Sequence, residues 1–140
     1  MKRVVAATVA ALLLVGLIAS AVSAQPQGTV TLTSATVNKA GQVQLNGTIV
    51  CPPYMNLGIN GQVTQAIGHK VLLQSGMGGG FECAAAGLTM WGTGAQAYNG
   101  TFSAGWAAIN LNFYDPSTCD QYGNCQYVAY GNFYVKLTNK

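Results

Sequence analysis

Residues 42–51 read QVQLNGTIVC, and this stretch decides the fold class. Every second residue from Val43 to Cys51 is apolar or small, and the residues between them carry amides and hydroxyls up to Thr48. A period of two is typical of a β-strand with one face in a core and one face in water. The other predicted strands, in chain order, cover residues 30–32, 57–67, 71–74, 81–83, 88–91, 106–114 and 129–137. No stretch after residue 24 has helical periodicity, so the sequence predicts an all-β domain.

Turn-forming residues separate these strands. Residues 38–41 (NKAG) supply a turn, and Pro52-Pro53 ends the strand before it because proline cannot donate to a β-ladder. Asn60-Gly61 is expected to form a tight hairpin turn or a bulge. The glycine-rich run 75–80 (SGMGGG) is expected to be a flexible connection.

The chain has four cysteines, namely Cys51, Cys83, Cys119 and Cys125. An even number of cysteines behind an export signal indicates disulfides, and three pairings are possible. A Cys119–Cys125 bridge closes a short loop that contains turn formers, which leaves Cys51 for Cys83. The long bridge is expected to contribute roughly 3–4 kcal/mol and the short one about 2 kcal/mol. A zinc site is excluded by the cysteine spacing and by the presence of one histidine.

The amino terminus has the features of a secretory signal. Lys2 and Arg3 precede an apolar run, and Val22-Ser23-Ala24 offers small residues for cleavage after Ala24. Retention of this segment as a membrane anchor is the alternative. We therefore predict a signal peptide over residues 1–24 and one domain over residues 25–140, secreted or held at the cell surface, with no membrane span after cleavage.

The predicted mature chain is almost uncharged. Its lysines and acids balance to four minus three, or +1, and it has no arginine. These charged residues are Lys39, Lys70, Lys136, Lys140, Glu82, Asp115 and Asp120. Nucleic-acid binding is excluded, because too few cations are present to neutralise phosphates. A polar but neutral surface is common among extracellular carbohydrate binders and among subunits that pack into fibres or layers.

About 7–8 short strands in a chain of this length predict an immunoglobulin-like antiparallel β-sandwich with two disulfides. A small β-barrel is the alternative. The export signal and the segments 49–51, 63–65, 83–91 and 102–109 resemble small secreted bacterial immunoglobulin-like domains of unknown function. The chain is also similar to the neocarzinostatin-type chromophore carriers, which are exported sandwiches with two disulfides, one closing a short loop near the carboxyl end. Their chromophore cleft has no residue-by-residue match here, so the resemblance implies the fold alone.

The residues that could carry catalysis are few. His69 lies in a predicted turn, and the acids are Glu82, Asp115 and Asp120. No Gly-x-Ser-x-Gly motif is present, and the acids fall beside a cysteine or in the short disulfide loop. Oxygens of Asp115, Asp120 and Asn124 are better explained by turn formation than by calcium binding. We expect no enzymatic activity, no metal and no cofactor.

One group of residues suggests a binding surface. If the last two predicted strands pair, their outward face collects aromatic rings and amides. The residues are Trp106, Asn110, Asn112, Tyr114, Tyr130, Asn132 and Tyr134. Such a face can stack on sugar rings or bury against another protein. The alternative is that these residues are cross-strand pairs that only stabilise the sheet, or that Trp106 is in the core; Trp91 is expected to be a core residue.

Three functions remain open. The first is a non-enzymatic extracellular binding or surface-interaction module for a carbohydrate or a protein. The second is a structural subunit that assembles into a fibre or a surface layer. The third is a small secreted protease inhibitor, whose exposed loop at residues 52–55 (PPYM) would enter a protease cleft.

Overall fold

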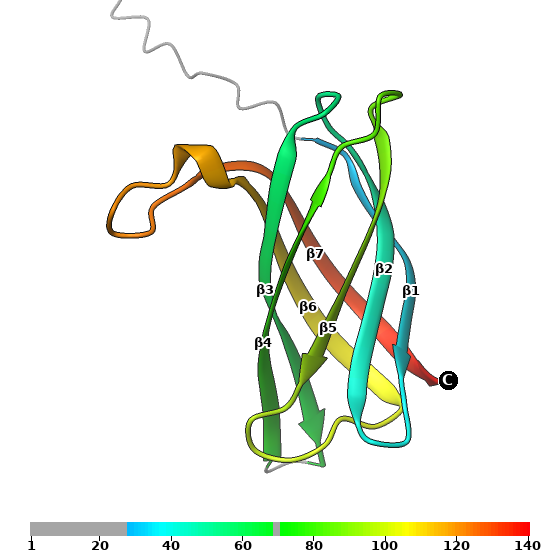
Figure 1. Cartoon of the computed structure of the whole chain (residues 1–140). Helices are drawn as coiled ribbons and strands as arrows, with labels where there is room; N and C mark the ends of the chain where they lie inside the picture. The colour runs from blue at the N-terminus through cyan, green and yellow to red at the C-terminus, as the bar shows by residue number, and fades with distance from the viewer. Residues whose placement is uncertain (1–27, 69–70) are drawn as a thin grey trace, which may run out of the picture.

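The structure is a computed structural model that describes residues 28–68 and 71–140 (Figure 1). The predicted signal peptide, residues 1–24, and His69 lie outside the described residues. The elements are β1 (Val30–Val37), β2 (Gln42–Val50), β3 (Asn56–Ile67), β4 (Val71–Glu82), β5 (Leu88–Gln96), β6 (Gly105–Asp115), the 3-10 turn η1 (Pro116–Thr118) and β7 (Gln126–Asn139). The prediction of an all-β fold is confirmed.

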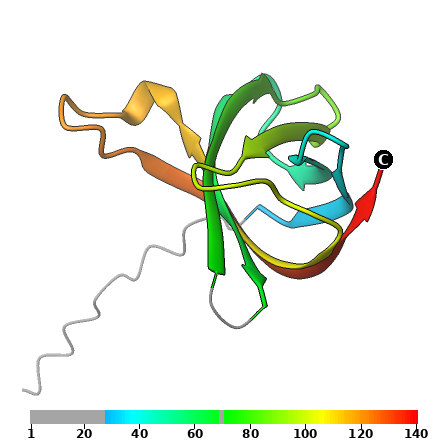
Figure 2. The same cartoon turned by 90° about the horizontal axis from the view of Figure 1, so that it is seen from below.

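The strands close into a barrel in the order β1-β2-β5-β4-β3-β6-β7, and the view along the barrel shows the ring (Figure 2). Neighbouring strands are antiparallel except β1 and β7, which are parallel. The closed barrel is the alternative that the sequence left open, and the immunoglobulin-like sandwich is not confirmed. In a sandwich the edge strands of the two sheets stay unpaired. Here β4 pairs with β5 and β1 pairs with β7, so the sheet has no free edge.

Two of the seams in this barrel are short. β4 and β5 pair only at Met77–Ala95 and Gly78–Gly94, and β1 and β7 pair only at two positions near their carboxyl ends. These seams divide the barrel into a three-strand half (β1, β2, β5) and a four-strand half (β3, β4, β6, β7). Because the seams supply few backbone hydrogen bonds between the halves, we expect side-chain contacts and disulfides that join the halves to contribute strongly to stability.

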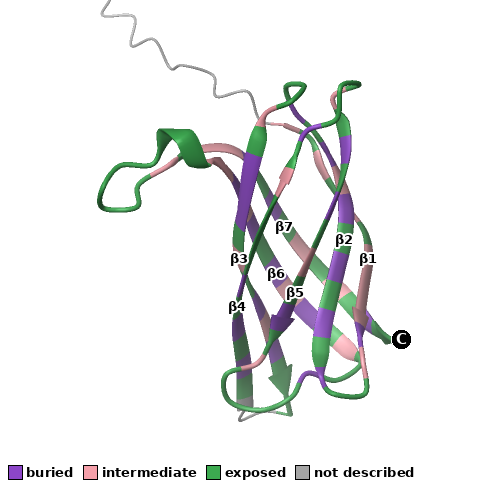
Figure 3. Ribbon diagram, viewed as in Figure 1, coloured by how far each residue is buried: buried purple, intermediate pink, exposed green. Residues whose placement is uncertain are grey.

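The interior is filled by alternate residues of the strands (Figure 3). A row of three aromatic rings crosses it: Trp91 packs edge-to-face on Phe113 at 5.4 Å, and Phe113 meets Phe81 at 6.2 Å. Gly47 makes room for this row, because a Cβ at that position would clash with the Trp91 ring. Trp91 is 3% exposed, which confirms that it belongs to the core.

The expectations for the two glycine-containing segments are wrong. β3 runs through Asn60-Gly61 without a turn or register shift and pairs with β4 from Asn56 to Ile67. The run 75–80 is not a flexible connection, because it lies within β4. At Gly61 a Cβ would clash with the Asn110 carbonyl oxygen of β6, so this glycine permits close strand approach.

Both predicted disulfides are present, Cys51–Cys83 and Cys119–Cys125. Cys51 follows β2 and Cys83 follows β4, so the first bridge joins the two halves of the barrel at one end. The second lies in the loop between β6 and β7, which pair as the sequence predicted.

A loop covers the part of β4 that β5 leaves unpaired. The Tyr98 amide donates to the Gln74 carbonyl at 3.1 Å, and the Asn99 side chain donates to the Leu72 carbonyl at 2.9 Å. The Asn99 amide oxygen also accepts from the Gln74 amide at 3.4 Å. Buried Gln65 fixes the same loop through two hydrogen bonds to the Ser103 backbone, at 2.8 and 3.0 Å. These side chains replace the missing neighbour strand and protect the edge from other chains.

Replacing Asn99 by alanine should therefore loosen this edge. We expect a loss of about 1–2 kcal/mol in the free energy of unfolding, because two backbone groups of β4 lose their partner. The Gln74 amide should also exchange faster with solvent. Urea denaturation and amide exchange measure these effects. Asn139→Ala is the matched control, because it truncates an exposed asparagine at the end of β7. Unchanged exchange at Gln74 would show that Asn99 does not cover the edge.

Candidate functional site

All the predicted face residues lie on the outward side of the four-strand half. Trp106, Asn110 and Asn112 oppose Lys136, Asn132 and Tyr130 across the β6–β7 ladder, and Ala108 opposes Tyr134. Tyr114 lies at the upper end of β6, next to Gly58 of β3. We call this surface the candidate face; its residues are Trp106, Asn110, Asn112, Tyr114, Tyr130, Asn132 and Tyr134. The alternative that Trp106 is a core residue is wrong, because its side chain is 56% exposed.

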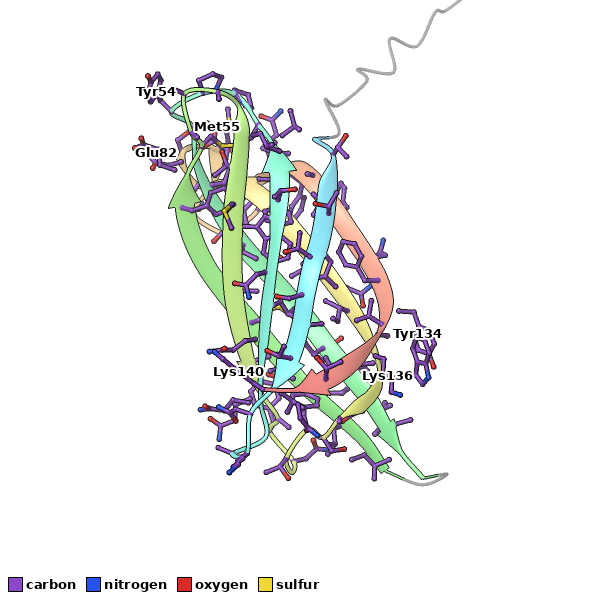
Figure 4. The ribbon with its side chains drawn as sticks, turned by 90° about the vertical axis from the view of Figure 1, so that its right-hand side faces the viewer. Tyr54, Met55, Glu82, Tyr134, Lys136 and Lys140 are labelled. Atoms are coloured by element: carbon purple, nitrogen blue, oxygen red, sulfur yellow. A yellow bond between two sulfur atoms is a disulfide. The ribbon has the colours of Figure 1, made fainter. Side chains whose placement is uncertain are left out.

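An exposed aromatic pair stands at the lower end of this face. The rings of Trp106 and Tyr134 stack at a centroid distance of 5.1 Å and an angle of 10°. Tyr134 is 70% exposed and projects from β7 away from the barrel, near Lys136 (Figure 4). A groove of about 490 Å³ runs beside the pair, and small residues such as Ala66, Gly105 and Ala108 line it. The pair therefore borders a groove that is open to solvent.

A band of amides occupies the middle of the face. The Asn110 side chain donates to the Asn132 side-chain oxygen at 2.6 Å, and the Asn112 side chain donates to that of Asn60 at 3.0 Å. These bonds join β3, β6 and β7 and fix the orientation of the amides. Each bonded amide still has donor or acceptor positions left, because a carboxamide offers two N–H groups and one oxygen with two lone pairs.

Three tyrosines lie at the level of Asn112 and above it, and we call them the upper tyrosine cluster: Tyr114 and Tyr130 of the face, and the adjacent Tyr127. The Tyr114 ring lies against Gly58, where a Cβ would clash with it. The rings of Tyr127 and Tyr130 are 5.4 Å apart. Gly58 is thus a glycine because an aromatic ring covers it.

Sequence reasoning missed Tyr127, Asn60 and the groove. Strict alternation puts Tyr127 on the same side as Ala129, which is buried. A bulge between Phe113 and Tyr114 shifts the register, so that Tyr114 pairs with Tyr127 and not with Val128. The expected turn or bulge at Asn60-Gly61 meant that Asn60 was not predicted to lie on the face beside Asn112.

The face is nearly uncharged. Lys136 lies at its lower end, beside Trp106 in the ladder, and Asp115 ends β6 at the upper end. The Ser117 hydroxyl and amide donate to Asp115 and lower the pKa of its carboxyl below the ordinary value. In the same way the Asn124 side chain and amide lower the pKa of Asp120. Both acids are therefore turn-stabilising groups that stay ionised in neutral solution.

Among the described residues, no cluster of three or more His, Cys, Asp or Glu side chains could hold a metal. Glu82 lies beside the Cys51–Cys83 bridge, at the same end of the barrel as Tyr54 and Met55 (Figure 4). Asp115 and Asp120 are tied into the η1 turn and the disulfide loop. The arrangement offers rings and amides for contact with a ligand, whereas the carboxylates of Asp115 and Asp120 already accept hydrogen bonds from backbone amides.

Two further surfaces lie outside the candidate face. The loop with Cys119 and Cys125 projects from the barrel as an arm (Figure 1). Tyr122 lies in the turn of this loop between Asp120 and Gly123 and is 81% exposed. The three-strand half carries an exposed apolar patch of Val50, Leu88 and Met90, which are 50%, 59% and 79% exposed. Val50 and Leu88 are direct ladder partners.

The proline loop at residues 52–55 has a turn conformation. Tyr54 has a φ of 61°, and its amide donates to the Cys83 carbonyl at 2.9 Å. The Met55 amide donates to the Pro52 carbonyl at 3.3 Å. A left-handed, internally bonded turn differs from the extended backbone that fits a protease cleft.

Comparison with known proteins gives no relative. No family model, no curated protein and no solved structure matches the chain. In the described part of the chain, no helix has the length and hydropathy needed to cross a membrane.

Proposed function

We propose that the protein is a non-enzymatic binding module that works outside the cell and holds its ligand on the candidate face. Both disulfides are compatible with an oxidising compartment. The candidate signal peptide adds support from the sequence. The chain's few ionisable groups favour binding over catalysis.

The observation that carries this proposal is the exposed Trp106–Tyr134 stack beside its groove. Large rings that are more than half exposed stabilise a barrel little, because most of their apolar area stays in water. The same rings are the residues most often found at the energetic centres of interfaces. Next to fixed amides they provide apolar contact and hydrogen bonding on one rigid surface.

A self-assembling subunit is the second candidate, and the patch of Val50, Leu88 and Met90 favours it. Exposed apolar residues that adjoin one another mark interaction sites. Light scattering at high concentration tests this candidate, which fails if the protein stays monomeric. The turn at Tyr54 gives no comparable support to protease inhibition.

A retention screen against immobilised glycans and extracellular proteins tests the proposed function. The Trp106→Ala, Tyr130→Ala double variant should weaken retention of the bound ligand at least about tenfold, since two aromatic contacts are lost. Tyr122→Ala is the matched control, because it removes an exposed tyrosine from the arm and leaves the face intact. Equal retention of the double variant and the wild type would end the proposal for this face.

A further inference from the structure

We propose that the ligand of the candidate face is an uncharged linear polysaccharide that lies along β6 and β7 and occupies two aromatic subsites. This inference rests on the proposed function and names the ligand class for the same surface. Four observations carry it: the groove beside Trp106, the distance to the upper tyrosine cluster, the amide band between them and the charge of the face.

The first subsite is the groove beside the Trp106–Tyr134 stack. Tyr134 covers one face of the indole, so a ligand ring stacks on the opposite face, above small residues such as Ala66 and Gly105. A pyranose ring suits this position because its axial C–H groups form an apolar face, while its hydroxyls point sideways. Stacking on a rigid ring costs little conformational entropy, since Tyr134 already holds Trp106 in place.

The second subsite is the upper tyrosine cluster. Tyr130 opposes Asn112, which is six residues from Trp106 along β6, and on β7 Tyr130 and Tyr134 are four residues apart. An extended strand rises about 3.3 Å per residue, which places Tyr130 about 13 Å from Tyr134 and about 20 Å from Trp106 along the strands. One sugar ring cannot touch both subsites. A ligand that uses both must be a chain.

The amides between the subsites match the chemistry of sugar hydroxyls. A hydroxyl donates and accepts. The pair Asn110–Asn132 and the pair Asn112–Asn60 present free donors and acceptors in two successive rows across the strands, the second row level with Tyr130. An extended peptide fits less well. β3 and β6 already have strand neighbours on both sides, so the centre of the face has no free backbone edge to pair with a peptide.

The charge of the face selects for a neutral chain. Lys136 is the one charged ladder partner of the face residues in β6, and Asp115 lies at the other end. A polyanionic chain would meet one cation and one carboxylate, which gives no net attraction. The amide band between them is neutral over its whole length.

Oligosaccharides of increasing length provide the test. The probes are neutral oligomers of β-1,4-linked glucose, N-acetylglucosamine, xylose and mannose, from dimer to octamer, with polygalacturonate as the anionic comparison. Titration calorimetry of the full chain should give an affinity for at least one neutral series that rises at least about tenfold from dimer to octamer, because the longer chain reaches the second subsite. Polygalacturonate should bind at least about tenfold more weakly than the neutral octamer.

Single variants separate the two subsites. Trp106→Ala should weaken every length at least about tenfold, whereas Tyr130→Ala should weaken the octamer and leave the dimer unchanged. Tyr122→Ala should change neither. An affinity that does not depend on length, or an equal effect of Tyr130→Ala on dimer and octamer, overturns the two-subsite inference and leaves the proposed function standing. Absence of binding to all neutral series overturns the polysaccharide inference, and a protein ligand that still depends on Trp106 would then preserve the proposed function alone.

Discussion

Replacing Cys51 and Cys83 together by alanine should destabilise the protein by roughly 3–4 kcal/mol. The bridge closes a loop with a sequence separation of 32 and so restricts the unfolded chain strongly. In the folded state both cysteines are buried, and the bridge joins the two barrel halves, which otherwise share two short seams. Loss of the bridge should also weaken two backbone hydrogen bonds at the same end of the barrel, from the Tyr54 amide to the Cys83 carbonyl and from the Cys83 amide to the Met55 carbonyl.

Urea denaturation under oxidising conditions measures this loss, and the matched control is the double alanine variant of Cys119 and Cys125. That bridge has a sequence separation of 6 and lies in the projecting arm. We expect the control to lose less than about 2 kcal/mol, because the arm can loosen without opening the barrel. Equal losses in the two variants would contradict the assignment of Cys51–Cys83 as the clamp between the halves.

Phe113→Ala should cost about 3–5 kcal/mol, a loss of the same size or larger. The Phe113 side chain is fully buried, and its ring contacts both Trp91 of β5 and Phe81 of β4. Its removal deletes the middle ring of the row Trp91–Phe113–Phe81, which joins the two halves of the barrel. The surrounding strands are held by hydrogen-bonded ladders, so the cavity cannot collapse fully.

The matched control is Phe133→Ala on β7. Phe133 is half-buried and packs on Gly131, so the same truncation removes less buried area. Thermal or urea unfolding should give a loss at Phe133 that is at most about half of that at Phe113. A larger loss at Phe133 would mean that the stability of the barrel depends on the β1–β7 side and not on the central aromatic row.

The sequence predicted the parts of the fold that depend on local pattern. Alternation from Val43 to Cys51 identified β2 and its buried face, and the short loop between Cys119 and Cys125 identified that bridge. Closure of the barrel was not predictable in the same way. Closure depends on two ladder pairs at each short seam. One seam joins β1 to β7, which are far apart in the sequence, and the other joins β5 to the glycine-rich part of β4, where apolar and polar residues do not alternate.

The glycines explain the remaining errors in the fold. Gly61 and Gly78 look like turn residues in the sequence, yet both lie in the ladder between β3 and β4. At Gly61 the reason for glycine is the nearby backbone of β6, which is a tertiary contact and leaves no local signal.

The candidate face was predictable because it depends on one hairpin. Once β6 and β7 pair, period two alone places Asn110 and Asn132 side by side. Tyr127 escaped prediction because a bulge breaks that period. The groove beside Trp106 escaped because it needs Ala66 and neighbouring residues of β3, which is distant in sequence.

The most direct test of the account is a map of the ligand-bound surface by amide and indole chemical-shift changes, recorded while the ligand retained in the screen is titrated into the labelled protein. We predict shift changes at the Trp106 indole, at Asn110, Asn132 and Tyr130, and none at Met90 or Tyr122. Shift changes that gather around Met90, Leu88 or the arm, with the candidate face unaffected, would contradict the account.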